Sequence, residues 1–200
     1  MRYIQQSAEV EKVDGVEVLR KIERIGRICY NSLDKITPTS YEGFVRGLIA
    51  SGHESVLEHV SLTATVVVNR AIAQEITRHR IGSYTHESTR YIKYKDLRVI
   101  VDPMLQSEYT DTVLENVEEL YIHGLNRGLP RELMRDILPL ATASTLVMTY
   151  NLRQWRHFFK LRYLGTTGRP HPQIKALAGE LLTQMQGMIP VVFDDMKEVE

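Results

Sequence analysis

The segment from Arg78 to Tyr91 carries the side chains best suited to bind an anionic ligand. It contains three arginines, two histidines and two serines among other hydroxyl-bearing residues, and Ile81 is its only aliphatic residue. The planar arginine side chain donates two parallel hydrogen bonds to phosphate oxygens, and hydroxyl groups can complete such a shell. The composition excludes a core segment and predicts either a solvated loop or a surface that binds a ligand rich in anionic oxygens.

A second polar run, His53-Glu54-Ser55-Val56-Leu57-Glu58-His59, invites a metal-binding interpretation. If the run is helical, however, its two histidines lie six residues apart and point about 120° away from each other. The zinc-binding spacing His-Glu-x-x-His is also absent. We therefore expect no metal site, and the simpler interpretation is the start of an amphipathic helix with capping acids.

A third run, residues 151–162, places aromatic and basic side chains at helical spacing. Trp155 and Phe158 share one helix face with Asn151 and Arg162. Aromatic stripes are more common in protein cores than in cofactor sites, and arginine stems often lie along them. By spacing alone, this run predicts a core helix.

Apolar periodicity predicts the elements that must position these residues. Strands are expected near residues 2–9, 60–68, 97–101 and 143–150. Helices are expected near residues 15–31, 39–52, 69–79, 107–126, 130–137, 151–163 and 172–188. Because strands and helices do not alternate as β-helix-β units, we expect an α+β fold. It would form a single domain over residues 1–200, with a mostly antiparallel sheet flanked by helices.

Local signals support several of these elements. In the strand at 60–68, apolar residues alternate with serine and threonine, as in a half-buried antiparallel strand. Thr39 and Glu42 match a capping box, whereas Asn69 and Pro130 suit helix starts. The helix near 107–126 should face the core through its apolar positions, which are Val113, Val117, Leu120 and Leu125.

Composition limits the class of protein. The chain has 200 residues, 43% of them hydrophobic and 25% charged, which suits one globular domain with a core. Its formal net charge is zero, which argues against binding to nucleic acid through bulk charge. No apolar run approaches the roughly 18–20 residues needed to span a bilayer, and the N-terminus lacks the apolar region of a signal peptide. We therefore expect a cytoplasmic protein.

The single cysteine, Cys29, rules out an intrachain disulfide and a multi-cysteine zinc site. It recurs at helical spacing with Leu19 and Ile22 on the apolar stripe of the first expected helix. We therefore interpret Cys29 as a structural thiol rather than a nucleophile.

The polar runs, taken together, resemble the signature of the flavin-dependent thymidylate synthases. The family's Arg-His-Arg, followed after seven residues by serine, is matched by Arg80 and Ser88, and the Ser-Thr-Arg-Tyr end is similar too. His53, Ser55 and Glu58 match the family's His-x-Ser/Thr-x-x-Glu-His element. Two further elements are matched by Asn151, Arg153 and Arg162 in an Asn-x-Arg…Phe-x-x-Leu-Arg helix and by Arg135 in Arg-x-x-Leu-Pro. By itself, Arg135 indicates only an exposed arginine on a short helix.

The resemblance implies a reductive methylation of dUMP to dTMP. Methylenetetrahydrofolate would donate the carbon, and NADPH would reduce FAD. Hydride carried by the cofactor removes the need for a protein nucleophile, so the protein would supply binding, orientation and electrostatics. The resemblance also implies a homotetramer with active sites shared between chains. The need of a 200-residue chain to enclose three ligands favours the same assembly.

The resemblance also assigns roles to individual residues. The implied catalytic residues are Arg162, Ser88 and His53. The implied dUMP contacts are Glu75, Arg78, Glu87, Ser88, Arg90, Arg135 and Arg162. The implied FAD contacts are His53, Ser55, Glu58, Arg78, His79, Arg80, Ser83, Asn151, Arg153 and His157. Since no activating base is evident beside Ser88, we interpret its hydroxyl as a hydrogen-bond partner of the phosphate.

Several positions depart from the family pattern. His157 stands where some members have asparagine, and His86 and Glu75 stand where glutamine is common. His171-Pro172-Gln173 replaces an Ala-Gln-x-Glu pattern. These departures bear on substrate detail more than on the reaction class. Methylation of another uridine nucleotide, such as UMP, remains an alternative, and a nucleic-acid-binding module using the basic segment 70–91 is a rival of a different class.

Overall fold

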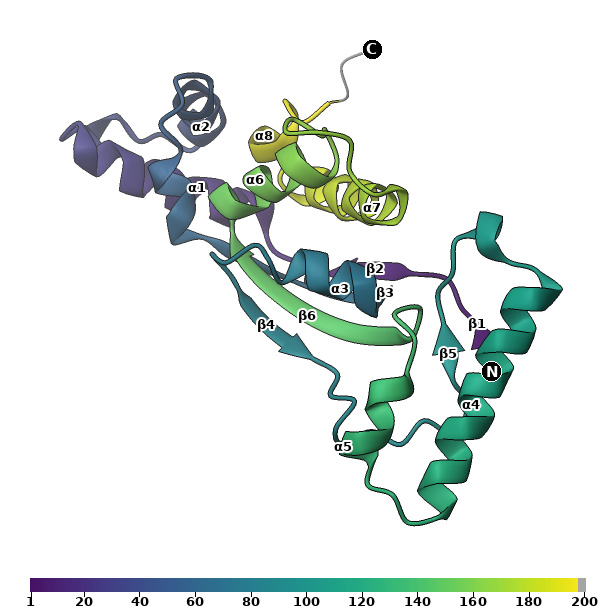
Figure 1. Ribbon diagram of the computed structural model, residues 1–200. Coiled ribbons are helices and arrows are strands. Elements are labelled where there is room, and N and C mark those ends of the chain that lie inside the picture. The colour runs from purple at the N-terminus through teal and green to yellow at the C-terminus, as the bar shows by residue number, and fades with distance from the viewer. Residues whose placement is uncertain (198–200) are drawn as a thin grey trace. The chain divides into compact units, whose positions relative to one another are not determined.

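The structure is a computed structural model, and it describes residues 1–197 of the chain (Figure 1). Helices make up 52% and strands 16% of it, and an antiparallel sheet is flanked by helices. This confirms the expected α+β class. The four-stranded sheet has the strand order β2-β3-β6-β4, formed by β2 (Ser7–Val10), β3 (Ser61–Asn69), β6 (Ala143–Asn151) and β4 (Ser83–His86).

The chain forms two compact units that interleave along the sequence. The first unit comprises residues 1–7, 65–80 and 84–147, and the second comprises residues 8–64, 81–83 and 148–197. The chain passes between the units within each of the strands β2, β3, β4 and β6, and also between residues 80 and 81. The expectation of one domain over residues 1–200 stays a prediction.

The first unit is built around the long helix α4 (Glu108–Asn126) and a two-stranded parallel sheet. In that sheet β1 (Arg2–Tyr3) pairs with β5 (Arg98–Val99), with Tyr3 opposite Val99. Its other elements are α3 (Arg70–Ile76), the 3-10 turns η3 (Pro103–Leu105) and η4 (Arg135–Ile137), and α5 (Arg131–Met134). The expected helix at 130–137 is therefore two short elements, which start after Pro130 at the N-cap.

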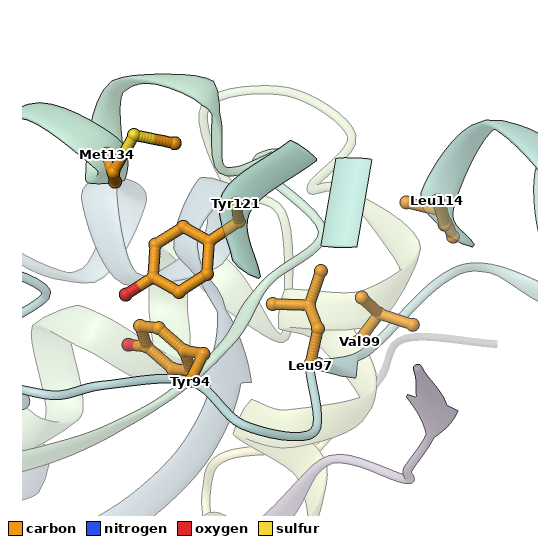
Figure 2. Close-up of a cluster of buried hydrophobic side chains, with 6 residues drawn as sticks. All are labelled: Tyr94, Leu97, Val99, Leu114, Tyr121 and Met134. Atoms are coloured by element: carbon orange, nitrogen blue, oxygen red, sulfur yellow. The ribbon is translucent and has the colours of Figure 1, made fainter. Parts of the chain in front are cut away.

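A cluster of buried side chains forms the core of the first unit (Figure 2). The rings of Tyr94 and Tyr121 meet edge to face with their centroids 6.0 Å apart, a favourable geometry for aromatic pairs. The remaining members are Leu97, Val99, Leu114 and Met134. Leu125 packs against this core as expected. The expectation was wrong for Val113 and Leu120, which are 44% and 53% exposed, whereas Leu114 and Tyr121 are buried. Leu114 and Tyr121 lie two helical turns apart, so they define the buried stripe.

The second unit packs its helices around an aromatic core. Its elements are α1 (Gly15–Cys29), η1 (Leu33–Lys35), α2 (Ser40–Ala50), η2 (Glu54–His59), α6 (Leu152–Arg162), α7 (Pro172–Met188) and α8 (Pro190–Phe193), together with β2. The rings of Trp155 and Phe158 are fully buried, with centroids 5.8 Å apart. Helices α6, α7 and α8 pack together, as Figure 1 shows. The core helix predicted from the aromatic stripe is thereby confirmed.

Several sequence signals give the right local structure. β3 buries Leu62, Ala64, Val66 and Val68 on one face, as the alternation predicts. Asn69 accepts a hydrogen bond from the backbone N–H of Ile72 at 2.9 Å and thus caps α3. α3 ends at Ile76, however, three residues earlier than expected.

Other local expectations were wrong. The side chain of Thr39 makes no capping hydrogen bond, since its backbone (φ −124°, ψ 2°) does not have the extended conformation usual for an N-cap. Instead, the hydroxyl of Ser40 accepts a hydrogen bond from the N–H of Thr37 at 2.9 Å. Cys29 is exposed at the last residue of α1, so it is not a buried structural thiol. The apolar stripe is buried only at its centre, around Leu19 and Ile22.

Candidate functional site

The candidate site residues fall into one set in each unit. In the second unit, His53 is held by the end of α2. Gly52 adopts the left-handed conformation (φ 73°), and the N–H groups of Gly52 and His53 bond the carbonyls of Ile49 and Leu48 at 3.0 and 2.8 Å. This pairing is a Schellman motif, which glycine favours because it has no Cβ. The sharp turn ends α2 and places His53 at the start of η2.

The η2 turn presents polar residues on a buried base. Val56 and Leu57 are buried, whereas His53, Ser55 and Glu58 are exposed. The segment is a 3-10 turn rather than the expected start of an amphipathic α-helix. The ring Nδ1 of His53 lies 3.2 Å from the hydroxyl of Tyr30, the residue after Cys29. That contact orients the imidazole next to an exposed aromatic ring.

Among the candidate residues of α6 and its N-cap, Asn151 caps the helix, and the others lie at or near the surface. The side chain of Asn151 accepts a hydrogen bond from the N–H of Gln154 at 2.8 Å and so caps α6. Arg153 is exposed, and its guanidinium lies 2.5 Å from the carboxylate of Glu58. His157 is exposed and Arg162 is half-buried at the last turn of the helix. Two of the expected flavin contacts, Arg153 and Glu58, therefore bind each other in this structure.

Sequence reasoning missed Arg156, whose side chain is only 2% exposed. Its guanidinium donates hydrogen bonds to Glu54 at 2.9 Å and to both carboxylate oxygens of Asp195 at 2.6 Å. Burial alone would lower the pKa of Arg156, but the hydrogen bonds and charges of Asp195 and Glu54 outweigh burial and raise it. The signal available in the sequence was the spacing of Arg153, Arg156 and Lys160, which puts three cations on one face of α6.

Ser83 and Gly82, in the middle of the arginine-rich segment, also belong to the second unit. Ser83 is exposed at the first residue of β4. A Cβ atom on Gly82 would lie 2.3 Å from the ring of Tyr150, far inside van der Waals contact. Position 82 therefore requires glycine for the close approach of the backbone to this ring. The segment is thus not a simple solvated loop, because it contains a strand and a packed glycine.

In the first unit, the Arg-His-Arg run alternates in exposure. Arg78 and Arg80 are exposed, whereas His79 is buried. The hydroxyl of Tyr84 donates hydrogen bonds to the carbonyl of His79 and, at 3.0 Å, to the carbonyl of Ile76. The backbone of the run is therefore held against the end of α3, while both guanidinium groups remain on the surface.

Residues 86 and 87 fasten the segment to β6. The hydroxyl of Ser144 lies 2.8 Å from His86 Nε2. The carboxylate of Glu87 accepts hydrogen bonds from the Tyr94 hydroxyl at 3.1 Å and from the backbone N–H of Thr145 at 3.3 Å. Burial, followed by the negative charge of Glu87, raises the pKa of Tyr94, so this phenol stays a donor. Glu87 is thereby an anchor of the segment.

His86 itself is half-buried. Burial, followed by the positive charge of Arg70, lowers its pKa, and the opposing effect of Glu87 is smaller. The imidazole of His86 is therefore neutral near pH 7, since its ordinary pKa is 6.5.

The remaining first-unit residues follow in a turn. The hydroxyl of Ser88 accepts a hydrogen bond from the N–H of Arg90 at 3.3 Å. Arg90 is exposed and pairs with Glu132 at 3.0 Å. Arg135 is exposed and lies 3.8 Å from Asp136, and Glu75 is half-buried on α3. The first unit thus carries three exposed arginines, Arg78, Arg80 and Arg90, in the segment 78–91. We call this the arginine segment, and the hydrogen bonds of Tyr84 and Glu87 hold it in place.

Among the described residues there is neither a metal-binding cluster nor a membrane-spanning helix. Within residues 1–197, no group of three or more His, Cys, Asp or Glu side chains could hold a metal ion. No helix in that part of the chain is long and apolar enough to cross a membrane.

Comparison with known proteins identifies the family. The family model described as thymidylate synthase complementing protein (Thy1) matches residues 13–191. The chain belongs to the flavin-dependent thymidylate synthase family. A probable flavin-dependent thymidylate synthase of Mycobacterium phage L5 is 34% identical over 197 residues, which cover 88% of this chain and 80% of the phage protein. This membership makes the protein an enzyme of the methyltransferase class.

Two further relatives are informative. The flavin-dependent thymidylate synthase of Mycobacterium tuberculosis (strain ATCC 25618 / H37Rv) is 33% identical over 199 residues, covering 88% of this chain and 78% of that protein. Among solved structures, the UMP/dUMP methylase PolB from Streptomyces cacaoi bound with 5-Br dUMP superposes with a TM-score of 0.83. It covers 97% of this chain and 96% of its own, at 23% identity. At that identity, the likeness shows the shared fold.

Proposed function

We propose that this enzyme converts dUMP to dTMP, with methylenetetrahydrofolate as carbon donor and NADPH as reductant through FAD. The observation that carries the proposal is the fastened arginine segment of the first unit. Tyr84 and Glu87 hold its backbone, while Arg78, Arg80 and Arg90 are exposed. Exposed guanidinium groups on a held backbone bind an anionic nucleotide at little cost in conformational entropy.

The donor set of the chain fits a flavin dinucleotide. In the second unit, exposed His53, Ser55 and His157 offer hydrogen-bond partners for a polar ring system. Arg153 and, in the first unit, Arg78 and Arg80 offer charge for a diphosphate. Bound FAD would supply the hydride chemistry that no side chain can supply. The Arg153–Glu58 ion pair must then rearrange or accept a further partner when flavin binds.

The substrate contacts implied by the family resemblance also suit the charge of the ligand. We assign Arg78, Arg90 and Arg135 to the dUMP phosphate, and Glu75 to a further contact with dUMP. Arg162 would stabilise negative charge on the pyrimidine carbonyl as the ring is polarised. Ser88 would donate its hydroxyl proton to the phosphate. We do not assign Ser88 as a nucleophile. Its oxygen accepts a hydrogen bond from the backbone N–H of Arg90, and an amide N–H cannot act as the base that removes a hydroxyl proton.

Methylation of UMP is the second candidate. It is supported by the fold likeness to PolB, a UMP/dUMP methylase also solved with 5-Br UMP, at a TM-score of 0.79 and 24% identity. Rates with dUMP and UMP, measured on the same flavin-loaded protein, separate the two. A kcat/KM ratio above about tenfold in favour of dUMP, equivalent to one good contact, supports the thymidylate assignment.

We also propose a homotetramer whose active sites combine residues of different chains. Large apolar side chains are exposed in the first unit, including Met104 at 93%, Tyr109 at 80% and Leu140 at 57%. Such side chains commonly mark protein–protein contacts. Mixing inactive Arg78→Ala and Arg162→Ala proteins after dissociation should restore part of the activity. A fully active, flavin-loaded monomer would contradict the shared site.

The absorption spectrum of the purified protein tests the proposed function most directly. We expect a flavin band, or its appearance with quenched fluorescence on titration with FAD. Reduced enzyme should then convert dUMP and methylenetetrahydrofolate to dTMP without oxygen. Colourless protein that neither binds FAD nor forms dTMP would leave the nucleic-acid-binding interpretation as the rival to examine.

A further inference from the structure

Arg156 joins three separate parts of the second unit. Its Nε donates to Glu54 on η2, and its two terminal nitrogens donate to Asp195, which follows α8. One terminal nitrogen also donates to the backbone carbonyl of Val192 in α8, at 2.5 Å. The guanidinium is therefore shared between the segment before β3 and the C-terminal segment 190–196.

Because the Arg156 guanidinium is buried, all of these contacts are needed to balance its charge. A guanidinium removed from water is tolerated only when its donors are satisfied and its charge is balanced. Arg156 is 2% exposed, and Glu54 is 16% exposed. Asp195 is half exposed, but it binds both terminal nitrogens at 2.6 Å in the forked geometry that is strongest for arginine and carboxylate. Removing either acid leaves a buried charge only partly compensated.

The other ion pairs between α6 and η2 are weaker. Arg153 and Glu58 are 53% and 47% exposed, so water and salt screen their attraction. Lys160 lies 3.7 Å from Glu54, beyond direct hydrogen-bond distance. Arg156 is therefore the dominant polar link that fixes η2 against α6.

We propose that Arg156 is a positioning residue through which the C-terminal segment 190–196 orders the segment 53–59. Asp195 binds the two terminal nitrogens of the Arg156 guanidinium and fixes its orientation. The Nε of Arg156 can then donate to Glu54 on the other side. His53, Ser55 and Glu58 then keep one arrangement for their ligand. The identity of that ligand as FAD rests on the proposed function, whereas the coupling between the two segments does not.

Hydrogen exchange on the flavin-free protein tests the coupling. In Asp195→Ala, the amides of residues 54–59 should exchange about tenfold faster than in the wild type, the effect expected for losing hydrogen bonds to a charged group. Amides in the middle of α7, at residues 178–185, should keep their wild-type rates. Asp194→Ala is the matched control, because Asp194 forms a surface ion pair with Arg46 and does not contact Arg156. Unchanged exchange at 54–59, or equal acceleration in α7, would overturn the coupling.

A binding measurement tests the consequence for the site. The Kd for FAD, from flavin fluorescence, should rise about tenfold in Asp195→Ala, while kcat at saturating FAD stays near wild type. Arg156→Lys, which keeps the charge but loses the fork, should fall between the wild type and Asp195→Ala. Faster exchange with unchanged FAD affinity overturns the positioning role. If the wild-type protein binds no FAD, the proposed function fails, and the exchange result alone decides on the coupling.

Discussion

The two units hold their candidate ligand segments by different means. In the second unit, a buried cation, Arg156, fixes η2 between two carboxylates. In the first unit, the carboxylate of Glu87 fixes the arginine segment, and its short contacts come from a phenol and a backbone amide. The nearest cation, Arg98, lies 3.8 Å from Glu87, which is too far for a direct hydrogen bond.

This difference predicts different sensitivities. A buried ion pair depends on both charges, so the loss of one partner leaves the other uncompensated. A carboxylate that accepts hydrogen bonds from two neutral donors can lose one and keep the other, so each loss is small. Loss of a single contact should therefore destabilise η2 strongly, and the arginine segment of the first unit only slightly.

The largest effect on stability is expected for Arg156→Met. It removes the buried charge but keeps side-chain volume, and both Glu54 and Asp195 lose the hydrogen bonds that Arg156 donates to them. We expect a loss of about 3 kcal/mol in the free energy of unfolding, the lower end for broken buried pairs because Asp195 is half exposed. Urea denaturation checks this value. A loss below that of the surface-pair variant Arg46→Met would contradict the contrast between the units.

Two arginines, one from each unit, should dominate activity. Arg162→Ala and Arg78→Ala should each lower kcat/KM for dUMP by roughly 10²–10³-fold, as for loss of a donor to developing or existing negative charge. Ser88→Ala should cost only about 1 kcal/mol in transition-state stabilisation. Exposed Arg127 and Arg24 provide alanine controls in the two units. An inactive Ser88→Ala beside active arginine variants would reassign Ser88 as a nucleophile.

Sequence patterns anticipated the parts of this architecture that depend on near neighbours. The alternation in β3 and the cap at Asn69 are set within a few residues, so their side-chain types suffice. The order of the polar runs likewise identified the family.

Contacts between residues far apart in the chain could not be predicted from such local patterns. Glu54 and Arg156 are 102 residues apart, and a charged residue among aromatic ones is ordinarily assigned to the surface. The face of α4 was misjudged because Tyr121 was not counted among its apolar positions, although its ring is buried. The β4 strand was missed because its polar residues carry no period-two apolar pattern.

The gradual response of the first unit can be tested with Tyr94→Phe. The ring remains in the core, but Glu87 loses a hydrogen bond of 3.1 Å. Since Thr145 still donates to Glu87, we expect a loss of about 1 kcal/mol in the free energy of unfolding. Thermal unfolding at fixed pH measures it. A loss matching that of Arg156→Met would remove the distinction between the two anchors.

The first unit should also respond to pH through His86. Burial, with Arg70, lowers the pKa of His86 in the folded state below the ordinary 6.5. A lowered folded-state pKa means that the unfolded chain binds the proton more readily, so stability is full above pH 6.5 and declines as the pH falls toward the folded pKa. The Tm of the wild type should fall between pH 7.5 and pH 5.5 by more than that of His86→Gln. Equal declines would assign the pH dependence to other groups.

The smallest effect is expected for Cys29→Ala. Because Cys29 is exposed, its replacement should change the free energy of unfolding by at most about 0.5 kcal/mol and leave dUMP methylation intact. Steady-state turnover and urea denaturation measure both quantities. Complete loss of turnover in a folded variant would show that the thiol takes part in the reaction.

The same thiol offers a reporter that needs no engineering. Cys29 is the only cysteine of the chain and is exposed, so a maleimide fluorophore would label one position per chain. It adjoins Tyr30, whose hydroxyl contacts the ring of His53 at 3.2 Å. A dye at this position therefore lies one residue from the tyrosine that contacts His53, near the place where a ligand of His53 would bind. Its emission should follow the arrival of that ligand in real time, independently of turnover.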